Sequence, residues 1–527
     1  MKRVFVLALA ALSFAGPQPP IRRLGTVRFA VSCAPSVRPR FNQAVALMHS
    51  FGFPAAIATF KDILRADPHC AMADWGLAIS AWGNPFAAGA RSAEQLQRGL
   101  LSVEDARAAG PPTARERGYI EAAARLYQNA DSLDQRSRLL GYRDAMAALA
   151  AAAPSDTEAV IFHALAAVAS ANPADKTYAA QLAAGATLER LFAVLPDHPG
   201  LAHYLIHTYD VPPLASRGLV AAQRYSKIAP AMSHALHMPS HVYTRIGAWQ
   251  ESISANVAAA AVARREGAVA EELHASDYQV YAYLQVGQDR AAERIVAALP
   301  AVAARMDPTR ITGAAPPAAG YYAIAAIPAR YAIERGDWTR AAHLMPSPSP
   351  VPYADAVTWF ARGLGSARIG DTAGARTAVI NLERGRDTLT ARHEPYWRDQ
   401  VEIQRLGVLA WLALAAGRND EALSTMRLAT EHEDATEKSA VSPGPLAPAR
   451  ELLGEMLLAL HQPAEALGAF EAALTREPNR SRSIAGAIDA ATAAGDATKA
   501  GRYQRARQAL DAHADRPSRV AATRPKG

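Results

Sequence analysis

The sequence has little cysteine, few aromatic residues and no long apolar run after its first residues. Aromatic residues make up 7% of the 527, whereas alanine is abundant and the apolar/polar alternation of strands is scarce. Because alanine is the best helix former, this composition predicts an all-α protein. Beyond the N-terminal segment no stretch reaches the ~18 apolar residues that a spanning helix needs, which predicts no membrane span.

The common short motifs of catalysis and nucleotide binding are also missing. There is no H-E-x-x-H, no G-x-S-x-G, no Walker loop and no G-x-G-x-x-G after a strand. The net charge is +7, but the arginines are scattered among acidic residues without a basic run. This distribution predicts no nucleic-acid partner. The sequence leaves open whether the chain is an enzyme.

Residues 1–20 have the pattern of a signal peptide. The opening M-K-R-V-F-V-L-A-L-A-A-L-S-F-A-G-P places two cations before a short apolar core and a small-residue cleavage site. Because the apolar core is too short for a membrane span, the pattern predicts a periplasmic or secreted protein. A frayed apolar N-terminus is the alternative.

The two cysteines, Cys33 and Cys70, are the complete set. In an exported protein they predict one disulfide that ties an N-terminal arm to the first repeats. Two free buried thiols are the alternative, and a metal or redox pair is usually closer in sequence.

The stretch Leu195–Trp249 contains two copies of one pattern. Shifting it along itself by about 34 residues, the period of tetratricopeptide (TPR) repeats, places His203 on His237 and His207 on His241. This period predicts a TPR-like α-solenoid, a stack of helix–turn–helix repeats of which about 9–11 pairs fit the chain.

The single best TPR match is Arg450–Pro478, in which Leu453, Gly454, Ala466 and Phe470 occupy signature positions. Small residues at these positions let two helices cross closely, and the aromatic ring fills the gap. The pro-rich loops at 345–352 and 442–448 are candidates for contact with a partner at the surface. The predicted divisions are an extended arm at 21–40, an array with the histidines at 41–306, a hinge or loop at 307–319, a second array at 320–512 and a disordered tail at 513–527.

Four histidines form the candidate site. His203 and His207, like His237 and His241, are four residues apart and therefore share one face of a helix. Equivalent positions of stacked repeats are neighbours, so we expect the four imidazoles to line one wall of the solenoid together. The concave groove is predicted to comprise His163, His203, Tyr204, His207, Asp210, His237, His241, Tyr243, Arg245, His274 and Tyr278.

Three interpretations of these histidines stay open. An i, i+4 histidine pair suits Zn, Cu or Ni, with Asp210 as a further ligand or as an orienting carboxylate. The groove can instead bind a ligand without metal, or the histidines can be structural. Because TPR arrays usually present grooves to other molecules, the leading hypothesis is a scaffold that binds a protein, a peptide or a small polar ligand. The alternative is a metal-binding protein or metalloenzyme built on His203, His207, His237 and His241.

The chain resembles a family of exported bacterial TPR proteins to which no activity is assigned. The resemblance covers nearly the whole chain, and its most distinctive segment is His237-Met238-Pro239-Ser240-His241. Further matching stretches are 24–33, 47–51, 67–76, 198–207 and 443–454. The resemblance implies a periplasmic or secreted α-solenoid and carries over no catalytic residue.

Overall fold

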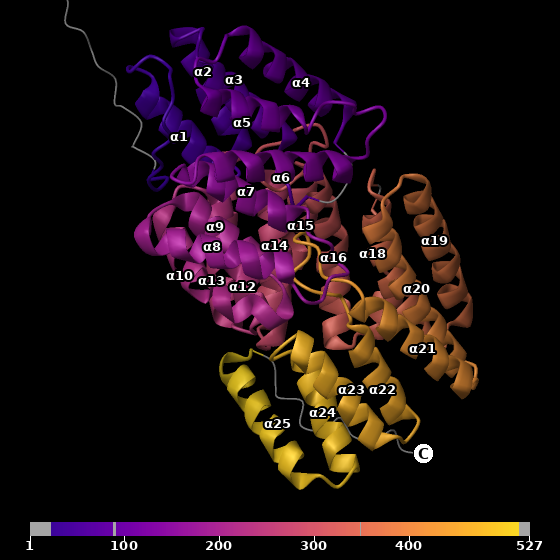
Figure 1. Ribbon diagram of the computed structural model, residues 1–527. Coiled ribbons are helices and arrows are strands. Elements are labelled where there is room, and N and C mark those ends of the chain that lie inside the picture. Colours follow the sequence, from indigo (N-terminus) through magenta and orange to yellow (C-terminus); the bar gives the residue numbers. More distant parts are fainter. Residues whose placement is uncertain (1–22, 88–90, 348, 516–527) are drawn as a thin grey trace, which may run out of the picture.

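A computed structural model describes residues 23–87, 91–347 and 349–515. Within these ranges the chain forms α-helices and two short 3₁₀-helices, and no strand. Most helices pack against a near neighbour in the chain, and α14 packs against both α13 and α16. Figure 1 shows the helices following one another from the indigo to the yellow end. The protein is an all-α, TPR-like α-solenoid, as predicted. The expected signal peptide lies outside the described residues.

The first third of the chain begins with an arm and continues as helical hairpins. A capping box, Ser92-x-x-Gln95, starts α4: the Ser92 side chain accepts from Gln95 N, and the Gln95 side chain accepts from Ser92 N. The helices are α1 (Arg38–His49), α2 (Phe53–Ala66), α3 (Ala71–Trp82), α4 (Ala93–Ala108), α5 (Ala114–Ala124), α6 (Gln135–Ala152), α7 (Thr157–Ala169) and α8 (Ala179–Val194).

The central third contains the histidine-rich stretch. Pro239 stands at the first position of α12, where its missing N–H costs nothing. The ring cannot continue the preceding helix, so α11 ends at His237. The elements are α9 (Pro199–Thr208), η1 (Pro212–Gly218), α10 (Leu219–Ile228), α11 (Ser233–His237), α12 (Pro239–Arg245), α13 (Trp249–Glu266), α14 (Val269–Gln285) and α15 (Asp289–Ala303).

The last third repeats the hairpin pattern and includes the best TPR match as α22 and α23. The elements are α16 (Pro317–Arg335), α17 (Trp338–Ala342), α18 (Pro352–Arg368), α19 (Thr372–Ala391), α20 (Pro395–Ala415), α21 (Asn419–Asp434), α22 (Ala449–Ala459), α23 (Pro463–Arg476), α24 (Ser481–Ala493), α25 (Ala497–Leu510) and η2 (Asp511–His513). None of the helices in the described ranges combines the length and the hydropathy needed to cross a bilayer.

The N-terminal arm is held by side chains instead of by a neighbouring strand. Phe29 N donates to Asn42 Oδ1 at 2.9 Å, and Ser32 N donates to Glu116 Oε1 at 2.7 Å. Leu24, Val27 and Phe29 of the arm are buried. Cys33 and Cys70 form the predicted disulfide, which joins the arm to the residue before α3.

The loop between α21 and α22, residues 435–448, crosses back to the central helices. Lys438 Nζ lies 2.9 Å from Asp210 Oδ2, and Lys176 Nζ lies 2.8 Å from Glu437 Oε1. The segment 442–448 was expected at the surface, but Ser442, Gly444 and Leu446 are buried. The expectation fails because this part of the loop packs against helices far away in the sequence.

Residues of the predicted hinge or loop and of the predicted tail also contact distant parts of the chain. In the predicted hinge, Ala314 N donates to Glu271 Oε1 at 2.6 Å, and both residues are buried. At the start of the predicted tail, Asp515 N donates to Gly287 O at 3.0 Å. The other tail residues, 516–527, lie outside the described part of the chain.

Candidate metal centre

Six histidines from four helices gather in the interior of the central repeats. Helix α9 contributes His203 and His207, one turn apart on one face. Helix α11 contributes its second and last residues, and the proline-started α12 and the long α14 contribute one histidine each. The six residues are His203, His207, His234, His237, His241 and His274, and none is more than 9% exposed.

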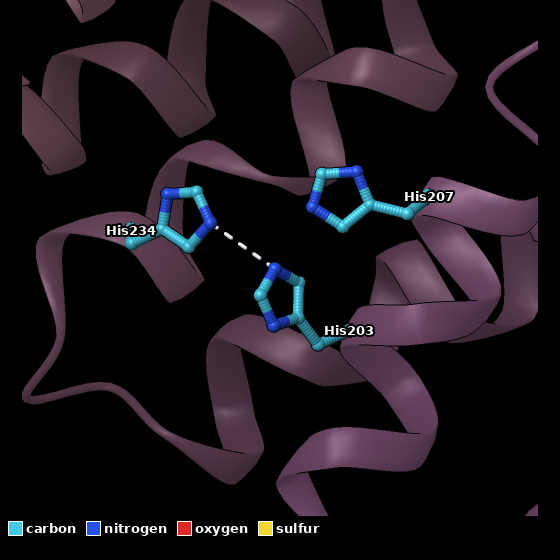
Figure 2. Close-up of side chains that lie close together, drawn as sticks. All are labelled: His203, His207 and His234. Carbon is cyan, nitrogen blue, oxygen red and sulfur yellow. Dashed lines mark hydrogen bonds between the residues drawn. The ribbon is translucent and has the colours of Figure 1, made fainter. Parts of the chain in front are cut away.

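The first triad consists of His203, His207 and His234. Each ring offers one nitrogen, and these atoms lie within 4.8 Å of one another. His203 Nε2 and His234 Nε2 are 3.1 Å apart, and Figure 2 shows the three rings turned toward one another. Among the described residues, His207 Nε2 has no hydrogen-bond partner although it is buried. A nitrogen in that position fits a missing ligand, because buried polar atoms are almost always paired.

The second triad consists of His237, His241 and His274, whose nitrogens also lie within 4.8 Å of one another. His237 Nε2 and His241 Nε2 are 3.1 Å apart. The rings of His237 and His274 have centroids 4.5 Å apart. His274 Nδ1 is buried and has no partner in the part of the chain that the structure describes.

Hydrogen bonds on the far side of the rings determine which nitrogen carries the proton in the second triad. His241 Nδ1 lies 2.8 Å from Asp210 Oδ2, and a carboxylate can only accept. His237 Nδ1 lies 2.6 Å from Asn256 Oδ1, while Asn256 Nδ2 donates to Ser252 O, which identifies the oxygen. Both Nδ1 atoms therefore carry the proton, and the two Nε2 atoms face each other with lone pairs and no hydrogen between them.

In the first triad, a hydrogen bond on the far side of one ring likewise determines which nitrogen carries the proton. His203 Nδ1 lies 2.6 Å from the backbone oxygen of His49, which again only accepts. His203 Nε2 therefore presents a lone pair to the centre of the triad. A histidine that ligates a metal typically donates its other N–H to a carboxylate or a backbone carbonyl in this way.

Burial keeps the imidazoles neutral. Burial, with a smaller contribution from the neighbouring His241, lowers the pKa of His203 and of His274 to about 3. Burial is also the main reason why the pKa values of His207, His234 and His237 lie well below the usual value for histidine. Neutral rings are the form that binds metal ions.

One carboxylate and two cations lie behind the second triad. Asp210 accepts from His241, from Lys438 Nζ and, through Oδ1, from Arg245 Nε at 2.9 Å. Burial alone would raise the pKa of Asp210, but Lys438 and Arg245 lower it well below the usual value for aspartate. Asp210 is thus an ionised carboxylate that orients His241.

The sequence-predicted site residues fall into three groups. The four proposed metal ligands do not meet at one point, because His203 and His207 belong to one triad and His237 and His241 to the other. Most members of the predicted groove are buried instead of lining an open surface: His203, Tyr204, His207, His237, His241, Arg245, His274 and Tyr278. His163 and Tyr243 are half-buried and belong to neither triad, and Asp210 lies behind the second.

Sequence reasoning missed His234, which completes the first triad. His234 lies three residues before His237, close enough to share its helix, but it has no counterpart in the 34-residue period and was therefore not predicted. A further buried cluster was also missed: Glu158 bonds His49 Nε2 at 2.9 Å and His198 Nε2 at 3.1 Å. In this cluster one carboxylate accepts a hydrogen bond from both rings.

Comparisons with known proteins add only distant similarities. No protein-family model and no curated protein sequence matches the chain. Among solved structures it is similar to a human IFIT1 dimer with m7Gppp-AAAA, at 11% identity over 80% of this chain and 87% of that one, with a TM-score of 0.39. It is also similar to the P58(IPK) TPR domain, at 14% identity over 81% of this chain and 99% of that one, with a TM-score of 0.21. At these values neither similarity carries information on what this chain binds.

Proposed function

We propose that this protein is a helical-repeat metal-binding protein whose two histidine triads each hold one transition-metal ion. The observation that carries the proposal is the approach of His237 Nε2 and His241 Nε2 to 3.1 Å, each with its proton on the other nitrogen. Two lone pairs at that distance repel each other, and a cation between them turns the repulsion into coordination.

The donor set narrows the choice of metal. Each triad offers three neutral imidazoles and no carboxylate oxygen. Ca²⁺ and Mg²⁺ prefer oxygen ligands, whereas imidazole suits Zn, Cu and Ni. Three protein ligands per site leave a coordination position for a further molecule, as in catalytic metal sites.

Export to the periplasm or secretion forms part of the proposal. The Cys33–Cys70 disulfide supports it, because disulfides persist in oxidising compartments. The role of a scaffold that presents a groove to a protein, peptide or polar ligand stays a prediction, and the buried histidines do not supply its surface.

Metal analysis of the full-length chain, purified without a polyhistidine tag, tests the proposal. The protein is stripped with a chelator, dialysed against Zn(II), Ni(II) or Cu(I), and its metal content is measured. With at least one of these metals we expect about two ions per chain for the wild type and about one for His207→Ala or His274→Ala, because each variant removes one ligand of one triad. His163→Ala, a half-buried histidine outside both triads, is the matched control and should retain both ions. A wild-type protein that retains none of the three metals contradicts the proposal.

A further inference from the structure

The two triads adjoin each other. The rings of His207 and His241 have centroids 6.1 Å apart, and those of His234 and His237 are 6.3 Å apart. Each of these pairs joins one triad to the other. Two ions held by the triads are therefore neighbours, and a small molecule bound at the open position of one is close to the other.

The charges around the triads decide which ion a pair of sites tolerates. The rings are neutral, and Asp210, the one carboxylate in contact with the second triad, is already paired with Arg245 and Lys438. Glu437 and Glu477 lie near these two cations and do not belong to either triad. Two divalent ions would add four positive charges to this interior without any carboxylate ligand, and burying uncompensated charge is costly. Two Cu(I) ions would add only two positive charges. Copper is also the metal among those suited to imidazole that is stable as a monovalent ion.

An apolar cavity adjoins the first triad. It measures about 30 Å³, and its lining includes Phe51, Phe53, Trp82 and Tyr204. The Phe51 ring contacts that of His203 with centroids 4.4 Å apart, and Phe86 stacks on His207 at 4.0 Å. Surroundings of this kind admit a small uncharged molecule and disfavour anions.

We propose that the two triads form one dicopper centre that binds dioxygen between the two ions. This inference rests on the proposed function and specifies its metal and its small-molecule ligand. Each Cu(I) gives one electron to dioxygen, so that two Cu(I) and O₂ become two Cu(II) and one bound peroxide dianion. No bond to the protein forms or breaks, and no proton is needed. The total charge of the occupied centre stays the same, because the two charges gained by copper equal those gained by peroxide.

Anaerobic loading of the full-length chain with two equivalents of Cu(I), followed by exposure to oxygen, tests this inference. We expect an uptake of one O₂ per two copper ions and a new charge-transfer absorption. We also expect a Cu(II) electron paramagnetic resonance signal far below the copper content, because the two spins couple through the bridge. Removal of oxygen should reverse these changes.

Variants distinguish a paired centre from two separate sites. His207→Gln and His274→Gln each keep a side chain of similar size. Each should lower oxygen uptake at least tenfold and abolish the charge-transfer absorption, because a single Cu(I) cannot supply both electrons of a peroxide. His163→Gln should behave as the wild type. Wild-type protein that binds two copper ions without oxygen uptake, or binds only zinc or nickel, overturns this inference and leaves the proposed function intact. A wild type that binds no metal overturns both.

Discussion

At the scale of single residues, the chemistry of the centre depends on groups that do not touch its middle. Asp210, Asn256 and the backbone oxygen of His49 each accept a hydrogen bond from one imidazole. These three acceptors direct the opposite nitrogens of His203, His237 and His241 inward as lone pairs. The identity of the acceptor therefore decides whether a ring can be a ligand.

Replacing Asp210 by asparagine tests this dependence. An amide can donate to His241 Nδ1, which moves the ring proton to Nε2 and removes that ligand. We expect the affinity of the second triad for metal to fall about 10–100-fold, the usual cost of losing such a partner, while the first triad is unchanged. Competition with a chromophoric chelator resolves the two affinities in one protein, so a general loss of stability does not imitate the effect. Asp197→Asn, at an exposed carboxylate, is the control, and an equal loss at both triads would contradict the argument.

Glu271 offers a second test, by pH. Burial raises the pKa of its carboxyl to about 7, although it accepts from Ala314 N. The pKa of Glu271 is therefore higher in the folded state than in the unfolded chain, where it is about 4.3. The protonated carboxyl contributes fully to the free energy of unfolding below a pH of about 4.3, and this contribution is lost as the pH rises through about 7.

Glu271→Gln cannot ionise, so its free energy of unfolding should increase relative to that of the wild type as the pH rises from 5 to 8. The gain is on the order of 2–3 kcal/mol, since one pKa unit corresponds to about 1.4 kcal/mol. Urea unfolding at the two pH values measures it. A difference between the two proteins that does not change with pH would show that the carboxyl titrates normally.

At the scale of elements, a buried arginine joins the C-terminal helices to the central helix α14. Arg480, which precedes α24, contacts Glu451 of α22 at 2.8 and 3.0 Å and Tyr281 of α14 at 3.1 Å. Arg480 and Glu451 are fully buried. Arg480 thus links the second array to the first through Tyr281, while Glu451 on another helix balances its charge.

Removing one partner of this pair should be costly. In Arg480→Met the Glu451 carboxylate keeps only its contacts with Arg482 and Ser483. We expect the free energy of unfolding to fall by about 3–5 kcal/mol, as for other buried pairs that lose one member. Urea unfolding measures the loss. Arg502→Met, at an exposed position of α25, should change the free energy by less than about 1 kcal/mol, and equal effects of the two variants would contradict the role assigned to the junction.

Local patterns predicted the elements well, and their long-range contacts poorly. In α22 and α23 the small and aromatic TPR positions meet as expected: a methyl group added to Gly454 would lie 2.8 Å from the Phe470 ring. The period of the histidines likewise located three of the four helices that form the centre. His234 was not predicted, because it falls outside the 34-residue period. Lys438 was not predicted, because it reaches Asp210 across more than two hundred residues and no local pattern encodes that contact.

At the scale of the whole molecule, one covalent cross-link holds the N-terminal arm to the repeats. This cross-link is the Cys33–Cys70 disulfide, whose two residues are 37 apart in the sequence. A cross-link of that span restricts the unfolded chain, which stabilises the folded state by about 3–4 kcal/mol in the chain-entropy model.

We expect the Cys33→Ser/Cys70→Ser variant to lose that amount in urea unfolding, and reductant to lower the stability of the wild type toward that of the variant. Reductant should have no effect on the variant, which serves as the control. A wild type that is insensitive to reductant while its thiols are shown to be free would contradict the structural role of the bond.

The burial of all six imidazoles also determines how an ion enters and leaves. None is more than 9% exposed, and Lys438 of the loop between α21 and α22 holds Asp210 from outside. An ion can therefore exchange with the solvent only when this covering opens, so its residence time is set by the rate of a local unfolding event. Above a modest concentration of chelator, the centre should empty at a rate that no longer depends on how much chelator is present.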